Sequence, residues 1–291
     1  AGHAVELVRT GSRGMHFLEP LVEVETSDGR IGYGPVGAGD VPGFVAAGLL
    51  EGGAHPLCIG RPEEHPFLAR QTRSTMALCG IVDPRSESDY RVHGGWRGLR
   101  AALAMDAESR VKTVAASGLR GRGGAGFPTG VKWGTVRLAR ADQKYVVCNA
   151  DEGDSGTFAD RMTMEGDPFR LVEGMVIAGV SVGATYGYVY IRSEYPHAIE
   201  AMEHAIREAR RAGWLGSSVG GSSGSRASGS GADSSSNSAS GGGAAGAAKA
   251  SGSAVVVGEA QVPGVQADLG GQRTGAQPQP ALAGVHLERM A

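Results

Sequence analysis

The sequence predicts an α/β protein: a small strand-rich piece, then a larger part built on a parallel sheet, then a low-complexity tail. The larger part is predicted because helix-type and strand-type apolar patterns alternate between residues 81 and 216. The first piece is predicted from an alternating strand pattern followed by an Asp-Gly pair. The tail begins at Ser217, where Gly, Ser and Ala replace most apolar residues. We therefore divide the chain into 1–54, a connector at 55–80, 81–216 and 217–291.

The first piece contains two or three strands within residues 5–36. The run LVEVET at 21–26 alternates in the way that strands do. The Asp-Gly pair that follows favours a tight hairpin turn, and IGYGPV at 31–36 is the return strand. A short helix comes next, with Asp40 at its N-cap. Residues 55–85 are irregular and rich in Pro, His and Arg.

Helical patterns dominate the next stretch of the chain. Residues 91–117 contain two helical runs, and Gly118 is the kind of residue that ends the second one. A further helix of two or three turns is predicted within 131–143. The continuous apolar run Tyr145–Cys148 is typical of a buried strand in a parallel sheet.

Strand and helix patterns continue to residue 216. Asp167 and Pro168 favour a helix start, as N-cap and first helical residue. GYVYIR at 187–192 is a second strand, and an amphipathic helix follows it and ends at Gly213. The order helix, strand, helix, strand, helix favours parallel strands joined by helices.

The tail offers little to bury. Residues 217–291 contain no Phe, Tyr or Trp, and their Gly/Ser/Ala bias is typical of flexible chains. We expect this segment to be disordered. The run AVVVGEAQV at 254–262 is a candidate strand, but nothing nearby in the sequence supplies a core for it.

Composition excludes several classes of protein. The formal net charge of -2 gives no sign of a nucleic-acid partner. Cys58, Cys79 and Cys148 form no Cys-x-x-Cys pair, which argues against a zinc or iron–sulfur centre in this chain and favours a reducing compartment. No apolar run reaches the roughly 18 residues that a membrane-spanning helix needs. We therefore expect a cytoplasmic protein without a membrane span or a metal site.

The glycine-rich stretch SGLRGRGGAGFPTGVKWG runs from Ser117 to Gly134. It matches G-x-G-x-x-G, but the dinucleotide fingerprint needs a strand before its first Gly, and a helix is predicted there. An RNA-binding Arg-Gly tract would repeat within a disordered region, whereas this stretch occurs once between ordered elements. Two interpretations remain: a surface turn, or a nest of backbone N–H groups that holds a phosphate or a flat ring.

Polar residues directly follow the first strand of the larger part. Asn149, Asp151 and Glu152 lie there, and ligands of open parallel sheets bind beyond the carboxyl ends of the strands. Carboxylates repel phosphate, but they suit the polar edges of a ribose, a flavin or a nicotinamide. A basic glycine-rich loop and an acidic strand end together favour a bound nucleotide.

Four segments carry a family resemblance. GLRGRGGAGFPTGVKW, CNADEGDSGTFADR, LVEGMVIAG and GYVYIRSEYPHAIEAMEHAIREAR closely resemble the flavin- and NADH-binding subunit family, over roughly Ile81 to Gly216. This family includes the 51-kDa subunit of respiratory complex I, the diaphorase subunit of NAD-linked hydrogenases and the beta subunit of NAD-dependent formate dehydrogenase. Two segments are most similar in sequence to the last of these, NADEGDSGTFADRMTMEGDPF and SRGMHFLEPLVEVETSDGRIGYGPV.

The resemblance implies an electron-transfer subunit that binds FMN and NAD. Hydride would pass directly between nicotinamide and flavin, so no catalytic acid or base is implied. Phe127 would stack on the nicotinamide, and Gly124 would let it approach. The other residues implied at the cofactor site are Gly121, Arg122, Gly123, Gly126, Lys132, Asn149, Asp151 and Glu152. Partners would be the iron–sulfur and substrate-oxidising subunits of a redox complex, and the first piece would be part of a thioredoxin-like domain without its cluster.

The chain departs from the family after Gly216. Members continue with a second flavin-binding segment and with a domain whose cysteines hold an iron–sulfur cluster, and neither follows here. We therefore expect a truncated, incomplete FMN/NADH-binding domain. The abrupt start of the tail at Ser217 is typical of out-of-frame translation of a GC-rich gene. The alternative function is a non-enzymatic fragment that binds cofactor weakly or not at all.

Overall fold

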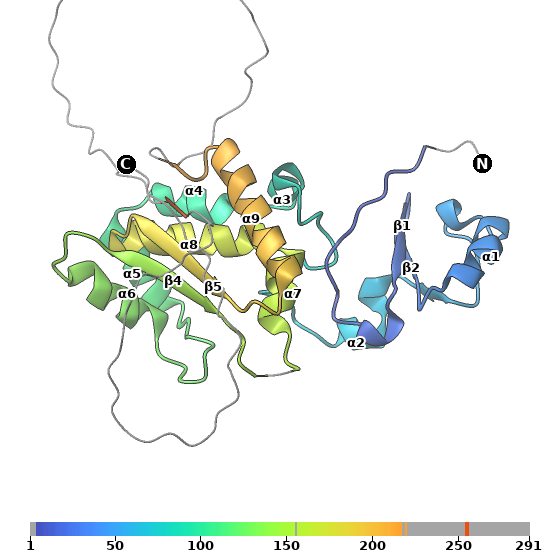
Figure 1. Ribbon diagram of the computed structural model, residues 1–291, viewed down its shortest axis with the longest axis horizontal. Coiled ribbons are helices and arrows are strands. Elements are labelled where there is room, and N and C mark those ends of the chain that lie inside the picture. Colours follow the sequence, from blue (N-terminus) through green and yellow to red (C-terminus); the bar gives the residue numbers. More distant parts are fainter. Residues whose placement is uncertain (1–3, 155, 217–218, 220–253, 256–291) are drawn as a thin grey trace, which may run out of the picture.

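The computed structural model describes residues 4–154, 156–216, 219 and 254–255. Figure 1 shows the N-terminal elements, in blue, to one side of a larger α/β part. An extended segment, residues 4–13, runs between the two. The helices are α1 (Val41–Ala46), α2 (Pro66–Ala69), α3 (Glu87–Val92), α4 (Arg97–Leu103), α5 (Ala107–Ala116), α6 (Thr129–Leu138), α7 (Ala159–Gly166), α8 (Pro168–Val182) and α9 (Pro196–Arg211).

The N-terminal elements form a small antiparallel sheet. Its strands β1 (Val22–Thr26), β2 (Gly29–Tyr33) and β3 (Cys58–Gly60) lie in the order β1-β2-β3. The predicted hairpin is confirmed, and Gly29 adopts the positive φ of +109° that its turn requires. The prediction that residues 55–85 are irregular is wrong in part. β3 and α2 lie within them, because Tyr33 of β2 pairs with Cys58 despite the distance in sequence.

Asp40 precedes α1, as predicted, but it does not cap that helix with its side chain. Its carboxylate accepts a hydrogen bond of 2.7 Å from the Gly37 amide instead. Asp40 belongs to a short 3-10 turn, Ala38–Asp40, and has a helical backbone conformation. The Asp40 side chain therefore closes the 3-10 turn that precedes α1 and does not cap α1 itself.

The larger sheet is parallel, as predicted. Its strands are β4 (Tyr145–Ala150), β5 (Tyr186–Ile191) and β6 (Ala254–Val255), in the order β4-β5-β6. α7 and α8 connect β4 to β5, and α9 follows β5. α8 packs on the sheet and also on α9, so the helices that follow β4 and β5 lie on the same face of the sheet.

The expectation of a disordered tail falls almost wholly outside the described residues. Ala254 and Val255 are an exception, because they form β6 and pair with Tyr186 and Gly187 of β5. The candidate strand in AVVVGEAQV is thus present in part. Its partner is a strand far back in the sequence, which local reasoning did not consider.

The helices before β4 confirm part of the sequence analysis. The two runs predicted within 91–117 are α4 and α5, and Gly118 has the left-handed φ of +68° expected after a helix. α3 was not predicted; it begins at an N-cap where the Ser86 side chain accepts from the Asp89 amide. α7 was not predicted, because its apolar face is short and its N-cap position is held by Phe158 rather than a typical capping residue.

The core lies between α8, α9 and the sheet. Met202, Ile206 and Ala209 of α9 are buried there, as the amphipathic pattern predicted. Glu173 of α8 is also buried, and its carboxylate accepts from the amides of Trp96 and Leu99 at 2.8 Å each. This side chain therefore caps the start of α4 from a neighbouring helix.

Asp167 departs from its predicted role as a side-chain N-cap of α8. It occupies the position before Pro168, but its carboxylate makes no cap hydrogen bond. It is fully buried and pairs with the Arg170 guanidinium at 2.6 Å. Burial raises the pKa of Asp167, which indicates that the ion pair offsets only part of its desolvation.

Candidate functional site

The glycine-rich stretch is a closed loop in front of α6. Arg120 and Pro128 form an isolated antiparallel bridge, and the Gly121 amide donates to the Phe127 carbonyl at 2.9 Å. The Arg120 guanidinium also donates to the Gly126 carbonyl at 2.7 Å. Arg120 therefore fixes the base of the loop and is not a free charge on its edge. The loop is built from residues 121–127 and leads directly into the first turn of α6.

The glycines of this loop are needed for its backbone conformation. Gly124 and Gly126 have φ values of +97° and +59°, which other residues adopt only with strain. A Cβ atom built on Gly123, Gly124 or Gly126 meets no other atom within 4 Å. The space beside these residues is therefore open, and a ligand can approach the main chain closely.

Two cations and one aromatic ring accompany the loop. Arg122 lies in it, Lys132 lies in the first turn of α6, and both are exposed. Phe127 is 50% exposed, which is high for a phenylalanine in a closed loop. The described residues give neither cation an ion pair, so both charges are available to an anionic ligand.

Gly130 sets the position of the loop relative to α5. It lies in the first turn of α6 and is buried against Ala115. A Cβ atom at Gly130 would lie 2.4 Å from the Ala115 Cα atom. The second glycine of GFPTG is therefore a packing residue that lets α6 approach α5.

Asn149 and Asp151 form a turn where β4 ends. The Asp151 amide donates to the Asn149 side-chain oxygen at 3.1 Å. Asn149 is exposed and Asp151 is half-buried, so both present polar atoms at the carboxyl edge of the sheet.

Glu152 is held more tightly than its neighbours. It has a left-handed φ of +48°, which is unusual for a residue other than glycine. Its two carboxylate oxygens accept from the Asp160 and Arg161 amides, at 2.9 and 3.2 Å, at the start of α7. Its carbonyl accepts from the Arg192 guanidinium at 3.0 Å. The carboxylate thus caps α7 and fixes the turn that carries Asn149 and Asp151.

Three residues at this edge were missed by sequence reasoning: Arg161, Arg192 and Tyr195. The two guanidinium groups lie 5.5 and 5.3 Å from the centre of the Tyr195 ring. Arg192 follows β5 directly, as Asp151 follows β4, and the register pairs Ala150 with Ile191. The strand-end rule that singled out Asn149 and Asp151 also applies to YIR, and it would have found Arg192.

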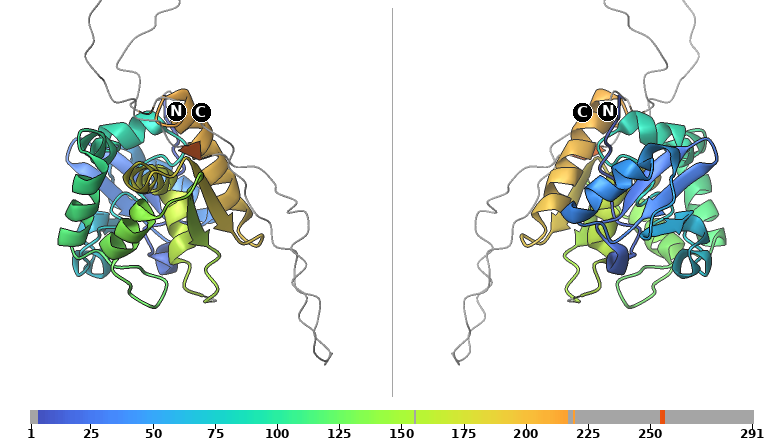
Figure 2. Two further views of the ribbon diagram at one scale, coloured as in Figure 1. Left: turned by 90° about the vertical axis from the view of Figure 1, so that its left-hand side faces the viewer. Right: turned by 90° about the vertical axis from the view of Figure 1, so that its right-hand side faces the viewer.

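The two loops lie at the same end of the α/β part. Figures 1 and 2 show the glycine-rich loop and the segment after β4 projecting in the same direction, beyond the carboxyl ends of the strands. The described chain joins them by no direct hydrogen bond or ion pair. The arrangement places a basic, glycine-lined surface near an acidic one, and both are open to solvent.

The comparisons with known proteins concern this part of the chain. Residues 114–257 match the family model described as the Nuo51 FMN-binding domain. Over these residues the chain belongs to that family. The family match extends past Gly216, where the motifs that carry the resemblance end, and includes β6.

Curated relatives of the Nuo51 family align with about half of this chain. The NADP-reducing hydrogenase subunit HndC of Solidesulfovibrio fructosivorans is 52% identical over 153 residues, which are 53% of this chain and 31% of that subunit. A subunit of the NADH-quinone oxidoreductase of Rhizobium meliloti is 52% identical over 143 residues, 49% of this chain and 34% of that subunit. The chain therefore spans about a third of the length of these relatives.

A solved structure is also similar. The crystal structure of a NAD+-reducing NiFe hydrogenase in the H2-reduced state gives a TM-score of 0.39 at 27% identity, over 61% of this chain and 29% of that chain.

The residues present fit part of an FMN site. The open space beside Gly123, Gly124 and Gly126 is a cradle that any Cβ atom would begin to fill. Backbone N–H groups and two cations suit a phosphate, and Asn149 and Asp151 supply acceptors for polar ring or sugar edges. FMN and NAD are the cofactors that fit the family and this donor set.

Proposed function

We propose that this chain carries the glycine-rich half of a nicotinamide- and flavin-binding site in an NADH:acceptor electron-transfer subunit. The observation that carries the proposal is the glycine-rich loop, which has an open main chain and an exposed Phe127 and lies at the same end of the α/β part as the segment after β4. The family match and the NADH- and NADP-linked relatives support it.

Each residue has a role in this proposal. Gly121, Arg122, Gly123 and Lys132 hold the phosphate and ring of FMN, which when bound accepts a hydride and releases electrons singly. Phe127 stacks on the nicotinamide, and Gly124 and Gly126 leave room for it. Asn149 and Asp151 accept hydrogen bonds from polar ligand edges. Glu152 caps α7 and so fixes the turn that carries Asn149 and Asp151.

The chain contributes orientation and charge rather than a catalytic proton. Transfer of a hydride between two rings needs them stacked and close, and the loop and Phe127 supply the surfaces for that arrangement. Arg122 and Lys132 balance the negative charge of the phosphates. The protein therefore acts through binding geometry.

The wider setting is also a proposal. Relatives are named as subunits of a hydrogenase and of an NADH-quinone oxidoreductase, so we propose a place in a multi-subunit redox complex in the cytoplasm. The formate dehydrogenase beta subunit remains the finer candidate, on the sequences of residues 12–36 and 149–169. The domain division at 54, 80 and 216 is part of the same proposal. No helix in the described residues is long and apolar enough to cross a membrane.

The test is a flavin titration of the purified full chain. FMN fluorescence quenching and calorimetry should give saturable binding, and Arg122→Ala should weaken it, with exposed Arg140→Ala as the matched control. NADH-dependent ferricyanide reduction then separates two outcomes. Binding with reduction supports the electron-transfer function. Absence of both favours the alternative, a fragment of the domain that lacks the affinity of the complete site.

A further inference from the structure

The extended N-terminal segment meets the end of α7 main chain to main chain. A Cβ atom built on Gly11 would lie 2.3 Å from the Gly166 Cα atom, a separation that real Cβ contacts do not show. Neither glycine has the left-handed φ that would itself favour this residue type. The two positions therefore need glycine because the two main chains touch.

Residues 79 and 80 complete this contact. The Cys79 side chain is fully buried, and its thiol donates to the Met162 carbonyl of α7 at 3.7 Å. Gly80 has a φ of +80°, and a Cβ atom on it would lie 2.3 Å from the Arg13 Cγ atom. Three pieces of chain thus meet with no room for a larger side chain. We call this contact the α7 junction; its residues are Gly11, Arg13, Cys79, Gly80 and Gly166.

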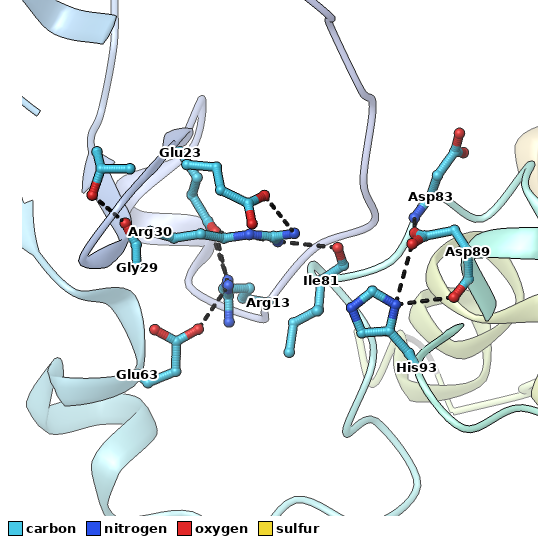
Figure 3. Close-up of polar contacts among 11 residues, drawn as sticks. Arg13, Glu23, Gly29, Arg30, Glu63, Ile81, Asp83, Asp89 and His93 are labelled. Carbon is cyan, nitrogen blue, oxygen red and sulfur yellow. Dashed lines mark hydrogen bonds and ion pairs between the residues drawn. The ribbon is translucent and has the colours of Figure 1, made fainter. Parts of the chain in front are cut away.

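Ion pairs tie the α7 junction to the N-terminal sheet, as Figure 3 shows. Arg13 is only 4% exposed, and its guanidinium donates to the Glu23 carboxylate of β1 at 2.7 Å and pairs with Glu63 at 2.9 Å. The Arg30 guanidinium of β2 donates at 3.0 Å to the carbonyl of Ile81, which directly follows the junction. A buried guanidinium keeps its carboxylate partners, because an unpaired buried charge is costly. The sheet therefore holds the junction in place.

α7 links this junction to the candidate cofactor site. Its last residue is Gly166, and the amides of Asp160 and Arg161 in its first turn donate to the Glu152 carboxylate. Only Met164 and Gly166 of this helix are buried. One buried side chain anchors a helix without fixing its direction, so the direction depends on what holds the two ends. Those are the α7 junction at one end and Glu152 at the other.

We propose that Gly11 and Gly166 are positioning residues for the candidate cofactor site. Their contact sets the direction of α7, and α7 sets the position of the turn at residues 149–152 through the Glu152 carboxylate. The N-terminal piece thus supports the site from a distance, because the eight residues of α7 span about 12 Å. The part that the turn plays in cofactor binding rests on the proposed function, whereas the link between Gly11 and Glu152 does not.

The first test is single-residue hydrogen exchange in the Gly11→Ala variant of the full chain. The new methyl group overlaps Gly166, so the end of α7 must move away from the segment. The Asp160 and Arg161 amides should then exchange at least about tenfold faster, because a tilted helix loses its hydrogen bonds to Glu152.

Three controls separate positioning from a general loss of stability. Gly39→Ala places a methyl group in open space in the same N-terminal piece and should leave both α7 amides unchanged. Tyr33→Phe removes a hydrogen bond of 2.8 Å to the Gly53 carbonyl, so it loosens the N-terminal sheet and should also leave them unchanged. The Gly121 amide, which is hydrogen-bonded within the glycine-rich loop, is the internal reference in every variant.

FMN affinity, measured by fluorescence quenching, is the second readout. Gly11→Ala should lower it about threefold to tenfold, because the variant moves the turn that carries Asn149 and Asp151. Gly39→Ala should leave it unchanged.

Four results overturn the proposal. They are unchanged exchange of the two α7 amides in Gly11→Ala, equal acceleration in Tyr33→Phe, acceleration of the Gly121 reference to the same degree, and unchanged FMN affinity beside faster exchange. If the wild-type chain binds no FMN, the proposed function is wrong and the positioning role for a cofactor falls with it. Faster exchange in Gly11→Ala then supports the link through α7 alone.

Discussion

Single residues decide what the glycine-rich loop can bind. Phe127 is half exposed although its main chain is fixed by the hydrogen bond from the Gly121 amide. An exposed aromatic ring on a rigid base is a stacking platform, whereas the same ring on a mobile loop would lose entropy on binding. The exposure of Phe127 therefore fits its proposed role, which is to stack on the nicotinamide ring.

Phe127→Ala should lower the affinity for NADH about tenfold, because one aromatic stacking contact contributes about 0.5–1.5 kcal/mol beyond its buried area. FMN affinity should change less than threefold, since the phosphate contacts lie elsewhere. Calorimetry with each ligand measures both values. Phe17→Ala is the matched control, because Phe17 is 59% exposed in the N-terminal piece. Equal losses for both ligands would contradict the assigned role.

Sequence motifs singled out the candidate site residues, but they did not reveal the structural roles of those residues. Gly121 to Phe127 and Asn149 to Glu152 stood out as motifs. The capping role of Glu152 depends on its left-handed φ and on α7, which the apolar pattern did not reveal. Arg192 depends on the register of β4 and β5, which only the paired strands define.

Elements position the loop through close helix packing. α5 and α6 cross at Gly130 and Ala115, where no side chain separates the two main chains. Sequence patterns predicted both helices but not the place where they cross. In a sequence, a glycine at a helix contact cannot be distinguished from a glycine at a turn. The motif GFPTG therefore combines one residue for ligand approach with another for packing.

Gly130→Ala should destabilise the chain by about 1–3 kcal/mol, as overpacking does in tight interfaces. The new methyl group would lie 2.6 Å from the Ala115 Cβ atom, so α6 and the loop must move. Gly134→Ala on the same helix is the matched control. Its Cβ atom would meet Val111 at an ordinary 3.6 Å, and the better helix propensity of alanine should stabilise by up to about 1 kcal/mol. Urea unfolding measures both, and similar values for the two variants would refute the packing role.

The whole molecule keeps one face of its parallel sheet uncovered in the described chain. α8 packs on one face, whereas Tyr145 and Val147 on the other are 51% and 64% exposed. Parallel sheets are normally covered on both faces. The prediction of a buried strand at Tyr145–Cys148 is therefore wrong for this face. The run is apolar on both faces, which indicates burial on both, but the described chain covers only one of them.

Exposed sheet surface of this kind should make the chain bind hydrophobic dyes and self-associate. Val147→Thr keeps the β-branched shape that suits a strand and replaces a methyl group by a hydroxyl. It should lower dye fluorescence and light scattering while changing the free energy of unfolding by less than about 0.5 kcal/mol. Val92→Thr is the control, because Val92 is 81% exposed on a separate helix. Equal effects of the two variants would mean that the sheet face is not the associating surface.

Alkaline stability depends on two thiols, those of the buried Cys79 and the half-buried Cys148. Burial raises the pKa of Cys79 to about 11, with the charge of Asp167 adding to the effect. Burial also raises the pKa of Cys148 to about 11, with a smaller contribution from Asp160. Unfolded cysteine titrates near pH ~8.5. The folded chain therefore holds both thiol protons more tightly than the unfolded chain does. This contribution to stability is complete below pH ~8.5 and is lost as the pH rises toward about 11.

Urea unfolding between pH ~8.5 and ~10, below the range in which unperturbed tyrosines titrate, should show a free energy of unfolding that falls with pH. The variant Cys79→Ala with Cys148→Ala should show a flatter dependence in the same window, even if its stability at neutral pH is lower because packing is lost. Cys58→Ala is the control, since Cys58 lies in β3 of the separate N-terminal sheet. An unchanged slope in the double variant would show that other groups control alkaline unfolding.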